Sequence, residues 1–204
     1  MNIILFGSPG SGKGTQADNI IKTFNLFKLS AGDLLRKETK KNTDLGKEIK
    51  STIDKGSMVS DSIMNNLISA ILIEKSFFNR ILFDGYPRNL NQAKNLDLML
   101  KKNKQYISCV FYLNVPQDVI LKRILGRETC SKCGNIFNKF FKPSTKENHS
   151  CGNSFLVKRS DDNEETLTNR FKNYSEITFP VMDFYKKQNL VHDIIGNAEI
   201  HEIF

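Results

Sequence analysis

A glycine-rich stretch near the start of the chain constrains its fold more than any other feature. Residues 5–17 read LFGSPGSGKGTQA, and they lie between an apolar run at residues 2–6 and a segment with helical spacing at residues 13–25. Glycine, proline and serine are poor helix and strand formers, so their concentration between two regular elements calls for an explanation. A tight strand-to-helix turn is one explanation, and a loop that binds phosphate groups is the other.

The loop carries side chains that phosphate binding needs. It matches the pattern G-x-x-x-x-G-K-[ST] with one shift, because Gly14 stands between Lys13 and Thr15. In such a loop, backbone N–H groups surround phosphate oxygens, and the start of the following helix adds a partial positive charge. Lys13 can reach the β- and γ-phosphates, and Thr15 can lie near Mg²⁺ or a phosphate. We therefore favour the phosphate-binding loop, and its nucleotide-binding residues are predicted to be Gly10, Ser11, Gly12, Lys13, Gly14 and Thr15.

Apolar runs alternate with helical patterns along most of the chain. The runs that predict strands are residues 2–6, 26–29, 80–83, 108–113 and 190–195. The helical patterns cover about 13–25, 32–42, 60–75, 89–102, 116–126 and 161–188, the last with a break near Pro180. This alternation predicts an α/β fold with a five-stranded parallel sheet and helices on both faces. Ligands of such sheets bind beyond the carboxyl ends of the strands.

Two segments do not follow the alternation. Residues 30–60 are helical and follow the second strand, whereas residues 127–160 are rich in Cys, Asn, Lys and Phe and have no strand–helix rhythm. We predict that both are lobes inserted on the ligand side of a core domain. The core is then made of residues 1–29, 61–126 and 161–204.

The charge of the chain favours anionic partners and excludes few of them. The net charge is +8, with 23 lysines and only 7 arginines among 204 residues. No run approaches the roughly 18 apolar residues of a membrane span, and the first apolar run enters the glycine loop too soon for a signal peptide. The four cysteines do not form the pattern of a secreted disulfide framework, so we expect a cytoplasmic protein with no membrane partner.

Five segments together resemble the adenylate kinase family, in order and over nearly the whole chain. They are GSPGSGKGTQA (7–17), LSAGDLLR (29–36), FDGYPRNLNQA (83–93), RILGR (123–127) and RSDDNEETLTNRF (159–171). The resemblance implies reversible phosphoryl transfer from Mg·ATP to AMP, which gives two ADP molecules. It also implies a monomer in which residues 30–60 cover AMP and residues 127–160 form a lid over ATP.

The resemblance also assigns roles to single residues. Asp84 would hold Mg²⁺ through water, Gln92 would bind the AMP base, and Asp161 and Asp162 would belong to the lid hinge. Each carboxylate also has an alternative interpretation without a ligand. Asp84 can simply form the turn after its strand, and Asp161 and Asp162 can simply open the following helix. The implied catalytic residues are Lys13, Asp84, Arg88, Arg123, Arg127, Arg159 and Arg170. Arg123, Arg127 and Phe137 would join the loop in binding ATP, although two arginines four residues apart can also form a plain solvated helix face. The implied AMP-binding residues are Ala31, Arg36, Ser57, Met58, Val59, Gly85, Arg88, Gln92, Arg159 and Arg170.

The arginines support this set, because six of the seven fall on these motifs and only Arg80 does not. Bidentate recognition of phosphate groups predicts that a lysine-rich chain keeps arginine at these positions. Two positions depart from the family pattern. Ala31 stands where a hydroxyl is usual, and Ser57 replaces a common basic or bulky residue, so the choice of acceptor base is less certain than the fold.

The cysteines of the lid suggest a metal site. Cys130 and Cys133 form a CxxCG knuckle, which is half of a typical structural zinc site. Longer lids in the family complete it with a second pair, and here Cys151 and His149 stand in that segment. The alternative is a zinc-free lid held by hydrogen bonds and by a core of phenylalanines, namely Phe137, Phe140, Phe141 and Phe155. Cys109 lies in an apolar run and is expected in the core.

Other functions compete with this interpretation. A kinase with a different acceptor or donor base (CMP, UMP or GMP, or GTP) is the nearest. A P-loop GTPase is disfavoured, because LNVPQD at 113–118 lacks the lysine and spacing of a guanine-reading segment. A zinc-knuckle nucleic-acid binder is disfavoured, because the basic surplus is mostly scattered lysine. We therefore expect ATP, AMP and ADP as partners and no specific nucleic acid.

Overall fold

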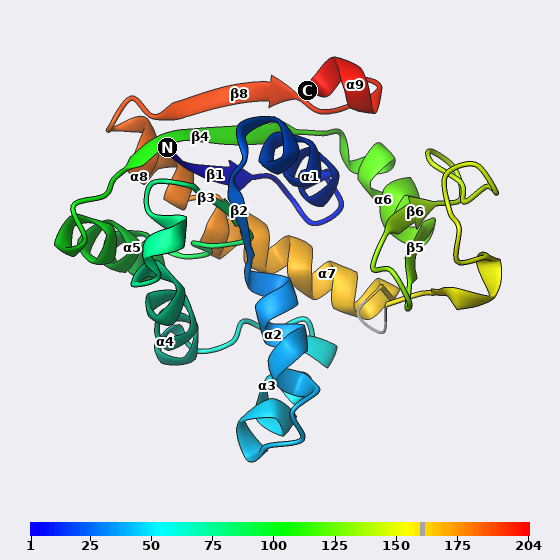
Figure 1. Ribbon diagram of the computed structural model, residues 1–204, viewed down its shortest axis with the longest axis horizontal. Helices are drawn as coiled ribbons and strands as arrows, with labels where there is room; N and C mark the ends of the chain where they lie inside the picture. The colour runs from blue at the N-terminus through cyan, green and yellow to red at the C-terminus, as the bar shows by residue number, and fades with distance from the viewer. Residues whose placement is uncertain (160–161) are drawn as a thin grey trace.

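A parallel β-sheet forms the centre of the molecule (Figure 1). The computed structural model describes residues 1–159 and 162–204, and within them the sheet has five strands in the order β2-β3-β1-β4-β8. The strands are β1 (Asn2–Phe6), β2 (Phe27–Ser30), β3 (Ile81–Asp84), β4 (Ile107–Asn114) and β8 (Val191–Ile195). Each neighbouring pair is parallel, which confirms the predicted fold class.

The sheet is buried on both faces because alternate side chains of its strands point in opposite directions. Ile4 and Phe6 of β1 pack toward helices α4 (Asp61–Leu72), α5 (Leu90–Lys102) and α8 (Val181–Lys186). Ile3 and Leu5 pack on the other face, in a cluster with Ala17 of α1 (Lys13–Phe24). This explains why the strand reads as a continuous apolar run.

The C-terminal helical region is interrupted, as its sequence predicts. Helix α7 (Glu164–Asn173) runs into a π-helical segment, η3 (Tyr174–Thr178), and α8 begins after Pro180. Helix α6 (Gln117–Leu125) packs against α7 through Ile120, Ile124 and Leu167. Two short helices, η1 (Lys75–Phe77) and α9 (Ile200–Ile203), were not predicted.

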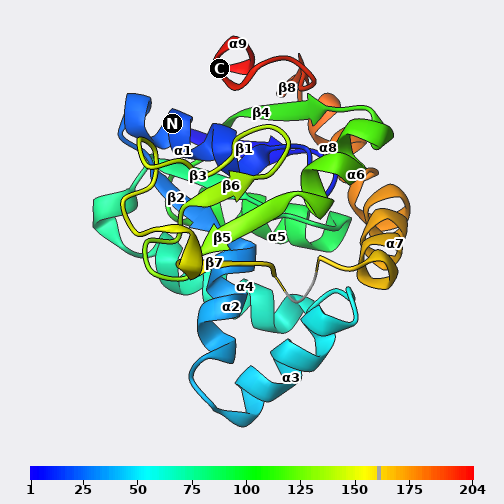
Figure 2. The same cartoon turned by 90° about the vertical axis from the view of Figure 1, so that its right-hand side faces the viewer.

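Two small lobes extend from the sheet (Figures 1 and 2). One contains α2 (Ala31–Thr39) and α3 (Asp44–Asp54), which lie at the bottom of both views. The other contains β5 (Arg127–Cys130), β6 (Ile136–Asn138), η2 (Asn153–Phe155) and β7 (Leu156–Val157). Its strands form an antiparallel sheet in the order β6-β5-β7, which the sequence did not predict.

The phenylalanine core that belonged to the zinc-free alternative is not formed in the second lobe. Phe137 is buried, but Phe140, Phe141 and Phe155 are 65%, 47% and 38% exposed. A sheet with strands of two to four residues is too small to enclose four aromatic rings.

No helix in the described part of the chain combines the length and apolar character of a membrane span.

Candidate functional site

The glycine-rich loop leads from the carboxyl end of β1 into the first turn of α1. Gly12 is the N-terminal cap of α1 and has a φ of 97°, a left-handed conformation that favours glycine. Gly10 has a φ of +81°, and a Cβ atom at this position would lie 2.5 Å from Cγ1 of Ile124. The loop therefore fits closely against α6, and glycine is required at both positions.

Lys13 lies inside this loop. Its Nζ donates hydrogen bonds to the carbonyl oxygens of Gly7 (2.6 Å) and Ser8 (2.9 Å). Burial lowers the pKa of the Lys13 ammonium to about 8; the carboxylate of Asp84 opposes the shift, and neighbouring arginines add to it. Anionic phosphates would stabilise the protonated form, so the loop is set to gain a full positive charge when such a ligand binds.

A cavity of about 440 Å³ opens at the carboxyl edge of the sheet. Asp84 enters it from the end of β3, between the ends of β1 and β2. The predicted catalytic and ATP-binding residues all line it, namely Gly10, Ser11, Gly12, Lys13, Gly14, Thr15, Asp84, Arg88, Arg123, Arg127, Phe137, Arg159 and Arg170. The structure thus brings together residues that lie far apart in the sequence.

Arg123 forms one wall of this cavity. Its Nη1 donates to the carbonyl of Ser11 (3.0 Å), and its guanidinium lies 5.6 Å from the ring centre of Phe141. Asn138 donates from Nδ2 to the Arg123 carbonyl at 2.6 Å. The arginine therefore joins the phosphate loop to the small β-lobe and offers a flat cationic surface beside an aromatic ring.

Arg127 is held by an acidic residue that follows the lobe. Its Nε donates to Oδ2 of Asp162 (2.8 Å), its Nη2 pairs with Oδ1, and Asp162 is also 3.8 Å from Nη1 of Arg170. Asp161, the other predicted hinge carboxylate, lies outside the described residues. One buried carboxylate therefore neutralises part of the charge of two arginines that face the cavity.

A smaller cavity of about 60 Å³ lies beside the first one. All but one of the predicted AMP-binding residues line it, namely Ala31, Arg36, Ser57, Met58, Val59, Gly85, Arg88, Gln92 and Arg170. The exception is Arg159, which lines only the larger cavity. Several residues line both cavities, and among them are Arg36, Arg88 and Arg170, so three guanidinium groups lie where the cavities adjoin.

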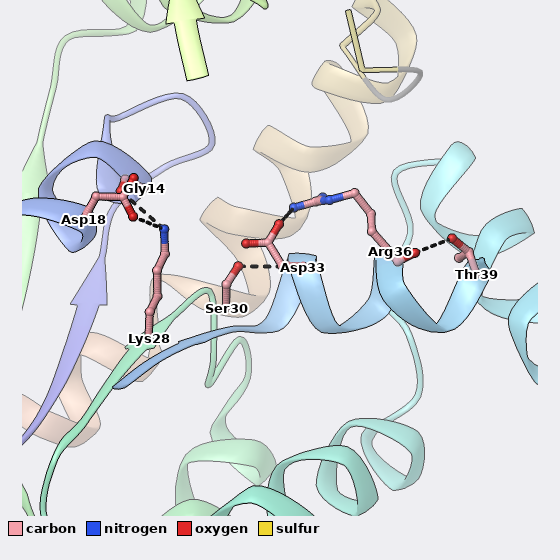
Figure 3. Close-up of polar contacts among 7 residues, drawn as sticks. All are labelled: Gly14, Asp18, Lys28, Ser30, Asp33, Arg36 and Thr39. Atoms are coloured by element: carbon pink, nitrogen blue, oxygen red, sulfur yellow. Dashed lines mark hydrogen bonds and ion pairs between the residues drawn. The ribbon is translucent and has the colours of Figure 1, made fainter. Parts of the chain in front are cut away.

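The start of α2 positions Arg36 (Figure 3). Ser30 caps the helix by accepting a hydrogen bond from the backbone N–H of Asp33 (3.3 Å), and the Asp33 carboxylate pairs with Arg36 at 2.6 Å. Burial raises the pKa of Asp33, but its hydrogen bond and ion pair with Arg36 outweigh this effect and lower the pKa overall. Nearby, Lys28 of β2 pairs with Asp18 of α1 at 2.8 Å and fixes the strand beside the loop.

Sequence reasoning missed one wall of the larger cavity. The segment after β8 contributes Asn197, Ala198, Glu199, Ile200 and Ile203. This segment carries no sequence motif. Its position at the carboxyl end of a parallel strand could nevertheless have indicated that it lines a ligand site. Phe140 and Phe141 also line this cavity, which explains why they are exposed rather than packed in a lobe core.

The cysteines of the small β-lobe come together with a histidine. The ligand atoms of Cys130, Cys133, His149 and Cys151 all lie within 4.8 Å of one another. A hydrogen bond between Nδ1 of His149 and Oγ of Ser144 (2.9 Å) orients the imidazole ring. Its Nε2 is buried and is without a hydrogen-bond partner among the described residues. An orphaned ring nitrogen beside three thiols fits a tetrahedral zinc site with a Cys₃His ligand set.

The protonation of Cys130 agrees with a metal-binding role. Burial raises the pKa of this thiol, but hydrogen bonds from the groups around it, the Cys133 backbone first among them, outweigh this effect and lower the pKa to about 6. The thiolate is the form that binds metal ions. Cys109 lies apart in β4, where it is half-buried and packs against a core cluster rather than being enclosed in it as the sequence had predicted.

The fold and the site are those of a P-loop protein, with a glycine-rich loop at the start of α1 and two adjoining cavities rich in arginine. The family model described as adenylate kinase matches residues 5–190. An adenylate kinase of Pelagibacter ubique is 48% identical over 203 residues, which cover 100% of this chain and 95% of the relative. Those of Enterococcus faecalis and Methanothrix thermoacetophila are 43% and 41% identical over 206 residues, with 100% of this chain and 95% of each relative covered. The chain therefore belongs to the adenylate kinase family.

Proposed function

We propose that the larger cavity takes ATP and the smaller cavity takes AMP, in the reversible phosphoryl transfer from ATP to AMP that membership of the adenylate kinase family gives this chain. The observation that carries this assignment is the position of Arg88 and Arg170, which line both cavities. A phosphoryl group passing between two nucleotides must cross the place where their sites adjoin. Guanidinium groups at that place match the charge of the transferring group.

The donor nucleotide is bound by the loop and by Arg123. Backbone N–H groups at the start of α1 and the ammonium of Lys13 face its phosphates. The guanidinium of Arg123 beside Phe141 offers a stacking surface for the base. Mg²⁺, which adenylate kinases use with ATP, would be held near Thr15 and Asp84 through water and would spread the charge of the β- and γ-phosphates.

The transfer itself needs positioning and charge neutralisation rather than a covalent intermediate. Arg36 and Arg88 hold the acceptor phosphate, while Arg127, Arg159 and Arg170 surround the transferring group. The backbone of Ser57, Met58 and Val59 borders the acceptor, and Gln92 contacts its base. In the structure, Asp33 and Asp162 hold Arg36 and Arg127 ready as ion pairs, which substrate phosphates would replace or share.

The two lobes exclude water while both nucleotides are bound, because water in the site would hydrolyse ATP. We assign residues 30–60 as the AMP-covering lobe, 127–160 as the lid, and residues 1–29, 61–126 and 161–204 as the core. Among the residues that the structure describes, helix α7 contacts the end of the AMP-covering lobe through three hydrogen bonds. They join Thr166 Oγ1 to the Asp54 carbonyl (3.1 Å), Asn169 Nδ2 to that of Lys55 (3.2 Å) and Asn173 Nδ2 to that of Gly56 (3.1 Å).

The lid is held by a structural zinc ion in this proposal. Cys130, Cys133, His149 and Cys151 would bind it, and the ion would replace the apolar core that the lid lacks. A monomeric state, a cytoplasmic location and the absence of a specific nucleic-acid partner remain predictions from the sequence.

The assignment of the cavities is tested by a pair of variants. Arg36→Ala should raise KM for AMP at least about tenfold and leave KM for ATP within about twofold, because Arg36, although it borders both cavities, is assigned here to the acceptor phosphate. Arg123→Ala should do the reverse. Arg80→Ala is the matched control, because Arg80 donates to the Asn25 carbonyl and belongs to neither cavity. Equal effects of Arg36→Ala and Arg123→Ala on both KM values would contradict the assignment.

A further inference from the structure

Gln92, the proposed contact of the acceptor base, is fixed by a closed set of hydrogen bonds. Its Oε1 accepts from the backbone N–H of Arg88 (2.8 Å), and its Nε2 donates to Oδ1 of Asp61 (2.8 Å). The same Oδ1 accepts from Nδ2 of Asn89 (2.8 Å), and Oδ1 of Asn89 accepts from the backbone N–H of Gln92 (2.8 Å). The Gln92 side chain is 1% exposed, so these contacts replace water.

This network permits only one orientation of the Gln92 amide. The backbone N–H of Arg88 is a donor and requires the amide oxygen, whereas the Asp61 carboxylate accepts hydrogen bonds and requires the amide nitrogen. Turning the amide over would place oxygen against carboxylate and N–H against N–H. Both of these mismatched contacts would be buried, where a polar group without a hydrogen-bond partner raises the free energy of the folded chain.

The fixed orientation leaves a defined surface for the base. An amide oxygen has two acceptor positions and an amide nitrogen has two hydrogens, and each has one of these already used. One acceptor and one N–H therefore remain, in fixed order, on a side chain that lines the smaller cavity. An adenine edge, with a donating N6 amine beside an accepting N1, is complementary to that order. A hypoxanthine or guanine edge, with an accepting O6 beside a donating N1–H, is complementary to the opposite order.

We propose that Asp61 is a specificity-determining positioning residue: it orients the Gln92 amide so that the site accepts 6-aminopurine and rejects 6-oxopurine monophosphates. Asp61 does not line either cavity and acts through Gln92. It is the first residue of α4, directly after the AMP-covering lobe, so it also fixes α4 to α5 at the acceptor base. This inference rests on the proposed function, in which Gln92 contacts the base of AMP.

The test compares AMP with inosine monophosphate, which differs in the two relevant positions of the ring, as acceptors for Mg·ATP. We expect the intact chain to favour AMP in kcat/KM by at least about 100-fold. Asp61→Ala and Asp61→Ser, both too short to reach Nε2, should reduce this ratio at least about tenfold. Asp61→Asn retains an acceptor oxygen and should keep the ratio within about threefold of the original.

The controls separate orientation from stability. Asp44 also begins a helix, α3, and its carboxylate pairs with the exposed Lys47 at 3.3 Å, so Asp44→Ala removes a first-turn carboxylate without touching the network. It should leave the ratio unchanged, and KM for ATP should stay constant in all variants. If Asp61→Ala does not fold, Asp61→Ser gives the same measurement with a polar hydroxyl in place of the carboxylate in the first turn of α4.

Equal losses with both acceptors in the Asp61 variants, and hence an unchanged ratio, would overturn the orienting role. Gln92→Ala distinguishes this from failure of the proposed function. If Gln92→Ala also leaves the ratio unchanged, Gln92 does not read the base, and both proposals fail together. If Gln92→Ala alone lowers the ratio, base reading stands and only the role of Asp61 is overturned.

Discussion

Arg127 and Asp162 lie 35 residues apart in the sequence and form a bidentate ion pair. This pair joins the beginning of the lid to the segment that follows the lid. The Asp162 side chain is only 3% exposed and that of Arg127 is 17% exposed. Asp162 stands just before α7, whose side chains also contact the end of the AMP-covering lobe. One helix thus links the bases of both lobes, which offers a physical route by which they could close together.

Removing the carboxylate of Asp162 should destabilise the chain. Asp162→Ala leaves Arg127 largely buried without its partner, so we expect a loss of about 2–4 kcal/mol in the free energy of unfolding. In a chain of this size, that loss lowers the melting temperature by about 5–10 °C. A thermal or denaturant unfolding curve measures both quantities.

A double-mutant cycle isolates the pair. Arg127→Ala, Asp162→Ala and the double variant should give a coupling energy of about 1–3 kcal/mol. The control is Lys139→Ala, which breaks the more exposed pair with Glu128 on the same lobe (3.3 Å) and should cost under about 1 kcal/mol. Additive single effects at Arg127 and Asp162 would show that the pair contributes nothing beyond packing.

Binding of Mg·ATP should take up protons near pH 8. The pKa of Lys13 is lowered by burial to about 8, so about half of the chains carry a neutral lysine at that pH. Phosphates bound at the loop raise this pKa and draw a proton from the buffer. We expect uptake of about half a proton per chain at pH 8 and almost none at pH 6.5, measured by calorimetry in two buffers of different ionisation enthalpy.

The same lowered pKa of Lys13 determines how the stability of the ligand-free chain changes with pH. Between about pH 8 and the ordinary lysine pKa of 10.5, the unfolded chain holds a proton on Lys13 that the folded chain has lost. The contribution of Lys13 to stability therefore becomes more favourable as pH rises through this window. Lys13→Met is the control for both effects. Proton uptake that is equal in Lys13→Met and in the unaltered chain would refute the assignment to Lys13.

The chain should contain about one zinc ion when it is purified without a histidine tag. Cys151→Ser removes one proposed ligand and should reduce the metal content below about 0.2 per chain, with a lower melting temperature. Cys109→Ser changes a cysteine outside the cluster and should retain the metal. Elemental analysis by mass spectrometry measures the content. A value below about 0.2 per chain in the unaltered protein would exclude the zinc site.

The sequence predicts the core well because its signals are local. A buried strand such as β1 is a continuous apolar run, and the loop from Gly7 to Thr15 carries its own pattern of glycines, lysine and hydroxyl. The strands of the lid are two to four residues long and pair antiparallel across long connections, so no window of sequence reveals them. Phe140 and Phe141 show the same limit, since composition suggests a core and the fold turns them toward the cavity.

Relationships between distant residues also escaped the sequence. The resemblance supplied Arg88 and Arg170 as candidate site residues, but only the folded chain places them along both cavities. Asp61 carries no motif of its own, and its contact with Gln92 depends on how α4 packs against α5. The wall formed by Asn197 and Ala198 depends on where β8 ends in the sheet.

The central claim is that this site transfers a phosphoryl group from ATP to AMP, and a coupled assay of ADP formation tests it most directly. The assay uses Mg·ATP with AMP, CMP, UMP or GMP as acceptor, and Arg88→Ala as the inactive reference. We predict turnover with AMP far above that with the other three, and a loss of at least about 100-fold in Arg88→Ala, because Arg88 lines both cavities. Preference for another acceptor, or ATP hydrolysis that does not depend on an acceptor, would contradict the account.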